Sequence, residues 1–266
     1  MEKISRKSFV KGALGLGAVG ILAGCASSAS STAASASSTA APAEKKEFTF
    51  ADTVRWDAQY DVVVMGMGAA GMVAAKTAAD NGAKVVIVEK CEEGKAGGNT
   101  KVCGQLFAYA NGDKDAAKSY YTALAGGRDI EPEIIDAISE GVANMADILA
   151  DEFGFNKDEY MDWTGVNVSG TNMGAMSPEY PEMPGHEKMA LWTTHAGASD
   201  GYLYQGLKQN VTDRVDDIDV WYSTPAKSLI QDPVTKTVVG VTVERDGKEM
   251  NIRALNGVCV CTGGFE

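Results

Sequence analysis

The sequence predicts an α/β fold organised around a parallel strand-helix-strand unit that runs from Tyr60 to Lys90. Apolar, mostly β-branched residues from Val62 to Met65 are typical of a strand that is buried on both faces. An alanine-rich helix is expected from Ala69 to Asp80, and a second apolar strand from Val85 to Val88. Three glycines stand in the G-x-G-x-x-G order where the first strand passes into the helix: Gly66, Gly68 and Gly71. This succession within about thirty residues predicts a Rossmann-like domain that binds a dinucleotide.

Each part of this unit has an expected role toward the dinucleotide. The first glycine allows a tight turn, the second lets a pyrophosphate approach bare backbone, and the third lets the helix lie close to the strand. The helix begins at Ala69 and Ala70, so its positive end is expected to face the phosphates. Glu89 ends the second strand, where its carboxylate can accept hydrogen bonds from a ribose diol and would repel a 2′-phosphate. The next residue, Lys90, is included in the predicted site.

Residues 1–25 have the pattern of an export signal. Basic residues precede an apolar stretch from Gly12 to Ala23 that is too short to span a bilayer. Residues 22–25 resemble a bacterial lipobox, which implies that Cys25 becomes a lipidated first residue. The protein is then expected on the cell-surface or periplasmic face of a bacterial membrane, held by its lipid anchor only. Residues 5–11 resemble a twin-arginine export motif with Lys7 in the second basic position, and a Sec-type signal is the alternative.

Residues 26–43 are almost wholly Ser, Ala and Thr and are expected to form a flexible linker, because they cannot bury a core. The folded body is therefore expected within residues 44–266, as one large domain or one domain and part of a second. The formal net charge of the chain is −12, and this acidic balance disfavours nucleic acid as a partner.

The cysteines and histidines favour neither thiol chemistry nor a metal site. No Cys-x-x-Cys motif is present, and Cys259 and Cys261 are interpreted as small buried side chains, with a disulfide to Cys91 or Cys103 as the alternative. The methionines between 161 and 189 are interpreted as packing, because cysteine is missing nearby. His186 and His195, the only histidines, are not expected to contact substrate. We predict no metal ligand and no catalytic residue.

A second glycine-rich segment follows the strand-helix-strand unit. Ala96 to Thr100 is expected to be too rich in glycine to hold regular structure, and it predicts a loop that wraps a long ligand. Here the sequence resembles the flavin-binding subunit of the fumarate reductase and succinate dehydrogenase type, especially its exported, soluble members. The second FAD loop of that family has Gly-Gly-Asn-Ser/Thr, then a small residue and a glycine pair. The matching residues are Gly97, Gly98, Asn99, Thr100, Cys103 and Gly104, with Gln105 at the second glycine of the pair.

The C-terminal part of the chain carries a third resemblance to this family. Strands are expected at 219–222, 225–230, 238–245 and 249–254, with turn signals that predict an antiparallel meander, and a last strand at 258–261. The family has such a meander, in which the backbone near Ala226 would meet the adenine. Residues 261–265 resemble its Ala-Thr-Gly-Gly-Phe motif, which implies that Thr262, Gly263 and Gly264 pass close to the FAD.

Helices are expected at 114–125, 131–153 and 200–215, from apolar residues spaced by three and four. Residues 155–201 look irregular, and by resemblance they begin an α+β capping domain. The expected divisions are therefore a first FAD-binding part at 44–155, a partial capping region at 156–200 and a second FAD-binding part at 201–266. The resemblance covers only the N-terminal half of the family's fold, so the chain is expected to be truncated.

The resemblance implies an FAD-dependent reductase that transfers hydride from the flavin to a C=C bond of a small unsaturated carboxylate. It also implies a separate electron donor, either a membrane quinol or a cytochrome system. Two alternatives stay open: a catalytically silent FAD-binding remnant, and a related flavoprotein that acts on a steroid or a urocanate-like acrylate. The 266-residue chain by itself is expected not to reduce fumarate, because the family's catalytic residues follow the last motif.

Overall fold

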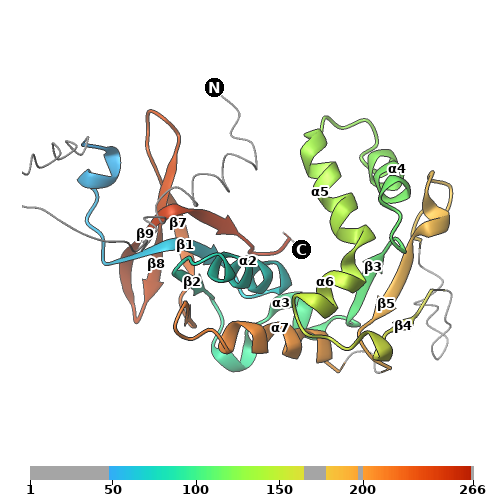
Figure 1. Cartoon of the computed structure of the whole chain (residues 1–266). Coiled ribbons are helices and arrows are strands. Elements are labelled where there is room, and N and C mark those ends of the chain that lie inside the picture. Colours follow the sequence, from blue (N-terminus) through green and yellow to red (C-terminus); the bar gives the residue numbers. More distant parts are fainter. Residues whose placement is uncertain (1–47, 165–177, 197–199, 265–266) are drawn as a thin grey trace, which may run out of the picture. The chain divides into compact units, whose positions relative to one another are not determined.

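The computed structural model describes residues 48–164, 178–196 and 200–264, and within them the strands form two sheets (Figure 1). The larger sheet has the strand order β6-β2-β1-β9-β8-β7, and the smaller sheet β3-β5-β4. The strands of the larger sheet are β1 (Ala58–Met65), β2 (Val85–Val88), β6 (Ile218–Trp221), β7 (Ala226–Gln231), β8 (Val238–Arg245) and β9 (Lys248–Val260). Those of the smaller sheet are β3 (Leu106–Tyr109), β4 (Met161–Asp162) and β5 (Ala190–Thr193).

The α-helices of the described residues all lie between β1 and β6 in chain order. The α-helices are α2 (Ala69–Asp80), α3 (Gly98–Val102), α4 (Lys114–Leu124), α5 (Pro132–Ala143), α6 (Met145–Asp151) and α7 (Tyr202–Thr212). Single 3₁₀ turns occur at η1 (Phe50–Thr53), η2 (Glu93–Lys95), η3 (Lys157–Glu159) and η5 (His186–Lys188). Among the described residues, none of these helices has the length and apolar character needed to cross a membrane.

The central strand-helix-strand unit was predicted correctly. Helix α2 and strand β2 have the predicted bounds, and β1 begins four residues earlier than expected. Strand β1 pairs in parallel with β2 and β9, and β2 pairs in parallel with β6. Val63 and Val64 are completely buried on opposite faces, one in each of the two cores that flank the sheet. A strand buried on both faces needs no polar alternation, which is why the apolar run predicted it.

Strand β9 corrects the predicted end of the meander. Two strands were expected, at 249–254 and 258–261, but Lys248–Val260 is one strand. It pairs antiparallel with β8 and in parallel with β1, so it joins the meander to the parallel half of the sheet. Gly257, with φ +147°, lies where the register with β1 shifts between Tyr60 and Val62. A bulge at this point lets the strand continue past Gly257.

The predicted helix at 131–153 was wrong in its continuity. It is interrupted at Asn144, which has non-helical φ −108° and ψ 10°, so that α5 ends there and α6 begins. The Asn144 side chain donates to the Glu140 carbonyl at 3.0 Å, and this local bond competes with the helical pattern. The helix predicted at 114–125 is α4, and the one predicted at 200–215 is the shorter α7, which starts after Gly201 at φ +78°.

The smaller sheet was not predicted. Strand β5 pairs antiparallel with β3, placing Phe107 opposite Trp192, and with β4, placing Asp162 opposite Trp192 on its other edge. Tyr109 packs edge-on against Trp192 with ring centroids 5.1 Å apart. The expectation of irregular structure for 155–201 is therefore wrong at 161–162 and 190–193, while 165–177 and 197–199 lie outside the described residues. The predicted export signal, Cys25 and the linker also lie outside them.

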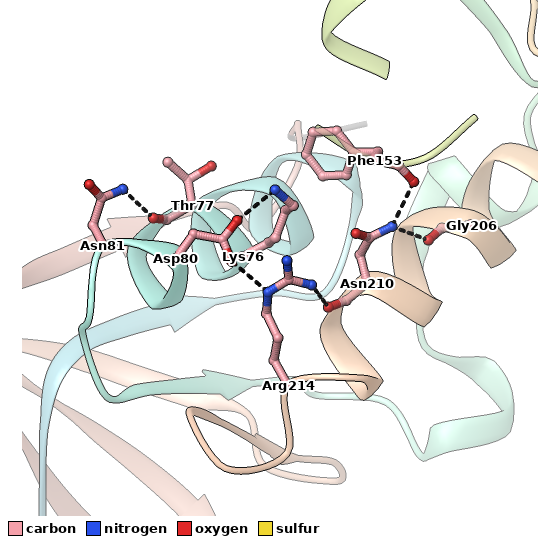
Figure 2. A network of polar contacts seen from close by, with 8 residues as sticks. All are labelled: Lys76, Thr77, Asp80, Asn81, Phe153, Gly206, Asn210 and Arg214. Atoms are coloured by element: carbon pink, nitrogen blue, oxygen red, sulfur yellow. Dashed lines mark hydrogen bonds and ion pairs between the residues drawn. The ribbon is translucent and has the colours of Figure 1, made fainter. Parts of the chain in front are cut away.

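A polar network around Asp80 connects α2 to α7 through Arg214, which lies two residues after α7 and donates to the carbonyl of Asn210 within it (Figure 2). Lys76 is only 5% exposed; its Nζ lies 2.6 Å from Oδ2 of Asp80 and 4.8 Å from the ring centre of Phe153. The other Asp80 oxygen accepts from Nε of Arg214 at 2.6 Å. Asn210 donates to the Phe153 carbonyl at 3.0 Å. These contacts tie the helix of the glycine motif to the helix that follows the smaller sheet.

Candidate functional site

A cavity of about 590 Å³ lies at the carboxyl ends of β1, β2 and β9. In open α/β sheets this is the edge at which ligands bind. Thirteen of the sixteen residues predicted to bind cofactor line it: Gly66, Gly68, Ala69, Ala70, Glu89, Lys90, Gly98, Asn99, Thr100, Ala226, Thr262, Gly263 and Gly264. The three sequence motifs therefore meet at one cavity, although 191 positions separate Gly71 of the first from Thr262 of the third.

Glycine stands at the three positions of the first motif for different structural reasons. A Cβ at Gly66, where φ is +98°, would come 2.5 Å from the Cys261 carbonyl oxygen, and a Cβ at Gly71 would overlap the Gly66 carbonyl oxygen. These two positions are thus fixed by contacts within the protein. A Cβ at Gly68 would approach nothing closer than Oγ1 of Thr100 at 3.7 Å, and its φ −76° and ψ −178° suit any residue. Within the protein, nothing demands glycine at Gly68.

The amino end of α2 is the electropositive wall of the cavity. Gly68 is its N-cap residue and provides no side chain, so the amides of the first turn have no intrahelical acceptor. The Ala69 amide donates to Oγ1 of Thr100 at 2.9 Å. That bond joins the first motif to the second. The remaining amides and the helix dipole favour an anion here.

Glu89 is held at the cavity by two backbone donors. Its side chain is buried at 6% exposure, with Oε2 accepting from the Met67 amide at 2.8 Å and Oε1 from the Cys91 amide at 2.9 Å. Each carboxylate oxygen keeps acceptor capacity. The Glu89 carbonyl also accepts from the Thr224 amide at 2.8 Å, and this bond brings the following Pro225 and Ala226 to the cavity.

The second motif differs from its prediction in local structure. Residues 96–100 were expected to lack regular structure, but Gly98–Val102 forms the short helix α3, with Gly97 as its N-cap at φ +117°. Gly97 does not line the cavity, because it packs under the ring of Tyr204, which a Cβ would overlap. Gly71 packs against the carbonyl of Gly66, in agreement with the packing role predicted for the third glycine, and Gly104 also lies off the cavity. Contact of these three residues with the cofactor stays a prediction.

The third motif closes the cavity beside β9. The Cys261 amide donates to the Met65 carbonyl at 2.9 Å, and Gly263 then turns at φ +86°. Cys259 and Cys261 are free and half-buried, and burial raises the pKa of both thiols. The sequence analysis did not predict seven of the residues that line the cavity, most of which are apolar and adjacent to predicted ones. They are Met65, Met67, Val88, Cys91, Pro225, Val260 and Cys261. Their adjacency to the motifs was the available signal.

Neither histidine is among the residues that line the cavity. Nε2 of His195 lies 2.6 Å from Oδ2 of Asp200, and its ring stacks on Tyr202 at 4.1 Å between centroids. Hydrogen bonds, first from the Tyr202 amide and then from His195, outweigh desolvation and lower the pKa of Asp200. Nδ1 of His186 contacts the Met183 carbonyl at 2.9 Å. Within the described parts of the chain, no three His, Cys, Asp or Glu side chains are grouped so that they could hold a metal ion.

The residues at the cavity fit a flavin dinucleotide. Gly68 leaves open the space that a side chain would fill, beside a helix amino end suited to a pyrophosphate. Glu89 follows the neighbouring strand β2, and its carboxylate oxygens keep capacity to accept hydrogen bonds from a ribose. The cavity therefore has separate places for the two polar parts of such a ligand.

Known proteins share this sequence and architecture. The model of the FAD binding domain family matches residues 61–266. NADH:fumarate oxidoreductase of Klebsiella pneumoniae is 30% identical over 216 residues, which are 77% of this chain and 20% of that protein. 3-Oxosteroid 1-dehydrogenase of Mycobacterium tuberculosis is 40% identical over 86 residues, 30% of this chain and 15% of that protein.

The fold of a steroid enzyme is also similar. The crystal structure of 3-ketosteroid delta1-dehydrogenase from Sterolibacterium denitrificans superposes with a TM-score of 0.62 at 20% identity, covering 78% of this chain and 48% of that one. The chain thus spans about a fifth or less of the two curated relatives and about half of this structure.

Proposed function

This chain belongs to the FAD binding domain family, of the fumarate reductase and succinate dehydrogenase type, and on that premise we propose that it is the flavin-holding part of an exported reductase. FAD is its cofactor. The proposed reaction adds hydrogen across a C=C bond conjugated to a carboxylate. The observation that carries the proposal is the meeting of three separate motifs at the carboxyl edge of the sheet, with an open backbone position at Gly68.

The proposed roles of the residues are binding and orientation. When bound, FAD supplies the hydride. The first turn of α2, from Gly68 to Ala70, is proposed to hold the pyrophosphate, and Glu89 the ribose. The backbone at Ala226 is proposed to contact the adenine. No catalytic group is assigned, because the described residues that line the cavity include neither arginine nor histidine.

The substrate class is proposed from the relatives. The Klebsiella relative is named for fumarate, which supports a small unsaturated carboxylate, and a separate donor such as a membrane quinol or cytochrome would supply electrons. The Mycobacterium relative is named for a 3-oxosteroid, and its 40% identity supports a steroid as the second candidate substrate.

An anaerobic reoxidation experiment separates these candidates. The purified chain, extended by any reading frame that continues past codon 266, is loaded with FAD and reduced with a viologen. Fumarate, urocanate and a 3-oxosteroid with a ring C=C bond conjugated to its ketone, each able to accept the hydride and a proton, are then added separately, and the return of the flavin absorbance is recorded. Reoxidation by fumarate alone supports the proposal, and reoxidation by the steroid alone supports the second candidate. A stop at codon 267 together with no reoxidation by any acceptor would favour the silent FAD-binding remnant.

Lipid anchoring of the exported protein through Cys25 is proposed as well, and it predicts that Cys25→Ala moves the protein from the membrane to the soluble fraction. The reason is that the lipid would anchor the protein in the bilayer, and no helix in the described ranges could span the membrane in its place. Fractionation and metabolic lipid labelling measure the outcome. Cys103→Ala, at an exposed thiol of the folded body, is the matched control and should stay at the membrane. A membrane-bound Cys25→Ala protein would refute the lipobox assignment.

A further inference from the structure

Gln105 is a buried polar residue whose backbone conformation is unusual. It is 1% exposed and has φ +61°, a region that glycine occupies at no steric cost and most side chains avoid. Gln105 also stands where the resemblance to the FAD family places the second glycine of a pair. A glutamine that is kept in a conformation suited to glycine points to a use for its side chain.

The amide group of Gln105 uses both its donor hydrogens and its acceptor. Nε2 donates to the Thr100 carbonyl at 2.9 Å and to the Cys103 carbonyl at 3.0 Å. Oε1 accepts from the Tyr204 amide at 3.1 Å, in the first turn of α7, where a helix has no acceptor of its own for that group. One side chain therefore connects the end of α3 to the start of α7.

Tyr204 holds the other end of the same segment. Its hydroxyl donates to the Ala96 carbonyl at 3.0 Å, and its ring fills the space above Gly97. Residues 96–105, which contain the second motif, are thus bound to the first turn of α7 at both ends. Helix α7 is in turn connected to α2 through Arg214, which pairs with Asp80 of α2 and donates to the carbonyl of Asn210 in α7.

Thr100 links this support to the cofactor. It lines the cavity, and its Oγ1 accepts from the Ala69 amide at the amino end of α2. We infer that Gln105 is a positioning residue for FAD, which sets Thr100 through its carbonyl and so fixes the second motif against the pyrophosphate end of the cavity. The inference rests on the same FAD site as the proposed function and on none of its substrate assignments.

The first test compares two glycine substitutions in the full chain. Gln105→Gly suits φ +61° and removes the side-chain bonds, and it should weaken FAD binding by about 10-fold or more, since one buried and two partly buried hydrogen bonds are lost. Asn111→Gly is the matched control, because Asn111 also has positive φ, +50°, but lies away from the cavity. It should leave FAD binding unchanged. Quenching of flavin fluorescence on titration gives the Kd, and far-UV circular dichroism checks the fold.

The second test asks whether Gln105 acts through Thr100. Thr100→Ala and Gln105→Gly are combined, and the loss in the double variant should be clearly smaller than the product of the single losses. Gln105→Glu fills the same space, keeps the acceptor for the Tyr204 amide and lacks the two donors, so it carries the same test if the glycine variant fails to fold.

A third measurement needs no cofactor. Hydrogen exchange of the Tyr204 amide in flavin-free protein should be faster in Gln105→Gly than in the wild type. Wild-type Kd in the folded Gln105 variants, or multiplicative losses in the double variant, would overturn the inference while leaving the FAD site intact. Absence of FAD binding by the wild type would instead overturn the proposed function, and the exchange rate would still decide whether Gln105 holds the segment.

Discussion

Replacing Gly68 with valine is expected to abolish flavin binding while the protein still folds. The backbone at Gly68 is extended, and the nearest protein atom to an added Cβ is Oγ1 of Thr100 at 3.7 Å, so the chain itself accepts a side chain. The added methyl groups would occupy the space that the pyrophosphate needs. The flavin absorbance band of the purified protein should be strongest in the wild type, weaker in Gly68→Ala and absent in Gly68→Val. Flavin content equal to wild type in Gly68→Val would contradict the assignment of this cavity to FAD.

The other two glycines of the motif are the matched controls. Gly66→Ala would bring a Cβ to 2.5 Å from the Cys261 carbonyl oxygen, and Gly71→Ala would overlap the Gly66 carbonyl. Both should therefore lose flavin together with their fold, which far-UV circular dichroism and thermal melting detect. If Gly68→Val also unfolded, the flavin loss would have no separate cause, and the distinction between these positions would be wrong.

Removing Asp80 should destabilise the protein, whereas replacing Lys76 with methionine should cost little. In Asp80→Ala the ammonium group of Lys76 stays buried without its carboxylate, and Arg214 loses the same partner. An unpaired buried charge costs more than an unpaired neutral group, and we expect about 2 kcal/mol here because Asp80 is partly exposed. Lys76→Met keeps the length of the side chain beside Phe153 and removes the buried charge, so it should be nearly neutral.

Denaturant unfolding of both variants measures this difference, and pH gives a second check. Desolvation alone would raise the pKa of Asp80, but hydrogen bonds from Lys76 and Arg214 outweigh it and lower the pKa. A carboxyl with a lowered folded pKa stabilises fully above its unfolded pKa, about 4, and loses that contribution as pH falls through the folded value. The gap between wild type and Asp80→Ala should therefore narrow below about pH 4. Equal destabilisation by Lys76→Met and Asp80→Ala would contradict the argument.

The strand-helix-strand unit was predictable because its signals are local. Spacing of the glycines, the apolar runs and the alanine-rich helix lie within one continuous segment, and the structure places α2 at the predicted residues. Strand β9 was harder, since the parallel pairing with β1 that carries it past Gly257 comes from a distant part of the chain. The strands of the smaller sheet, two to four residues long, are too short to show an alternating pattern.

The candidate site, too, was predictable only where its signals are local in the sequence. Residues in the three motifs were identified because each motif brings bare backbone or an acid to one edge of the sheet. The support behind them was not identified, because burial depends on tertiary packing: Lys76 looks like a solvated helix residue in the sequence, yet it is 5% exposed. Gln105 was noticed only as a departure from a glycine pair, and its contact with Tyr204 spans 99 positions.

Strand β1 has its two sheet neighbours in very different places along the chain. Its partner β2 follows within twenty residues, whereas β9 begins only at Lys248, with Ala58 opposite Ile252. During synthesis, one edge of β1 therefore stays unpaired until β9 has been made. Such distant pairing slows folding and leaves an apolar strand edge open to other chains. A nascent chain halted before β9 should accordingly remain bound to chaperones and be cleaved readily by proteases.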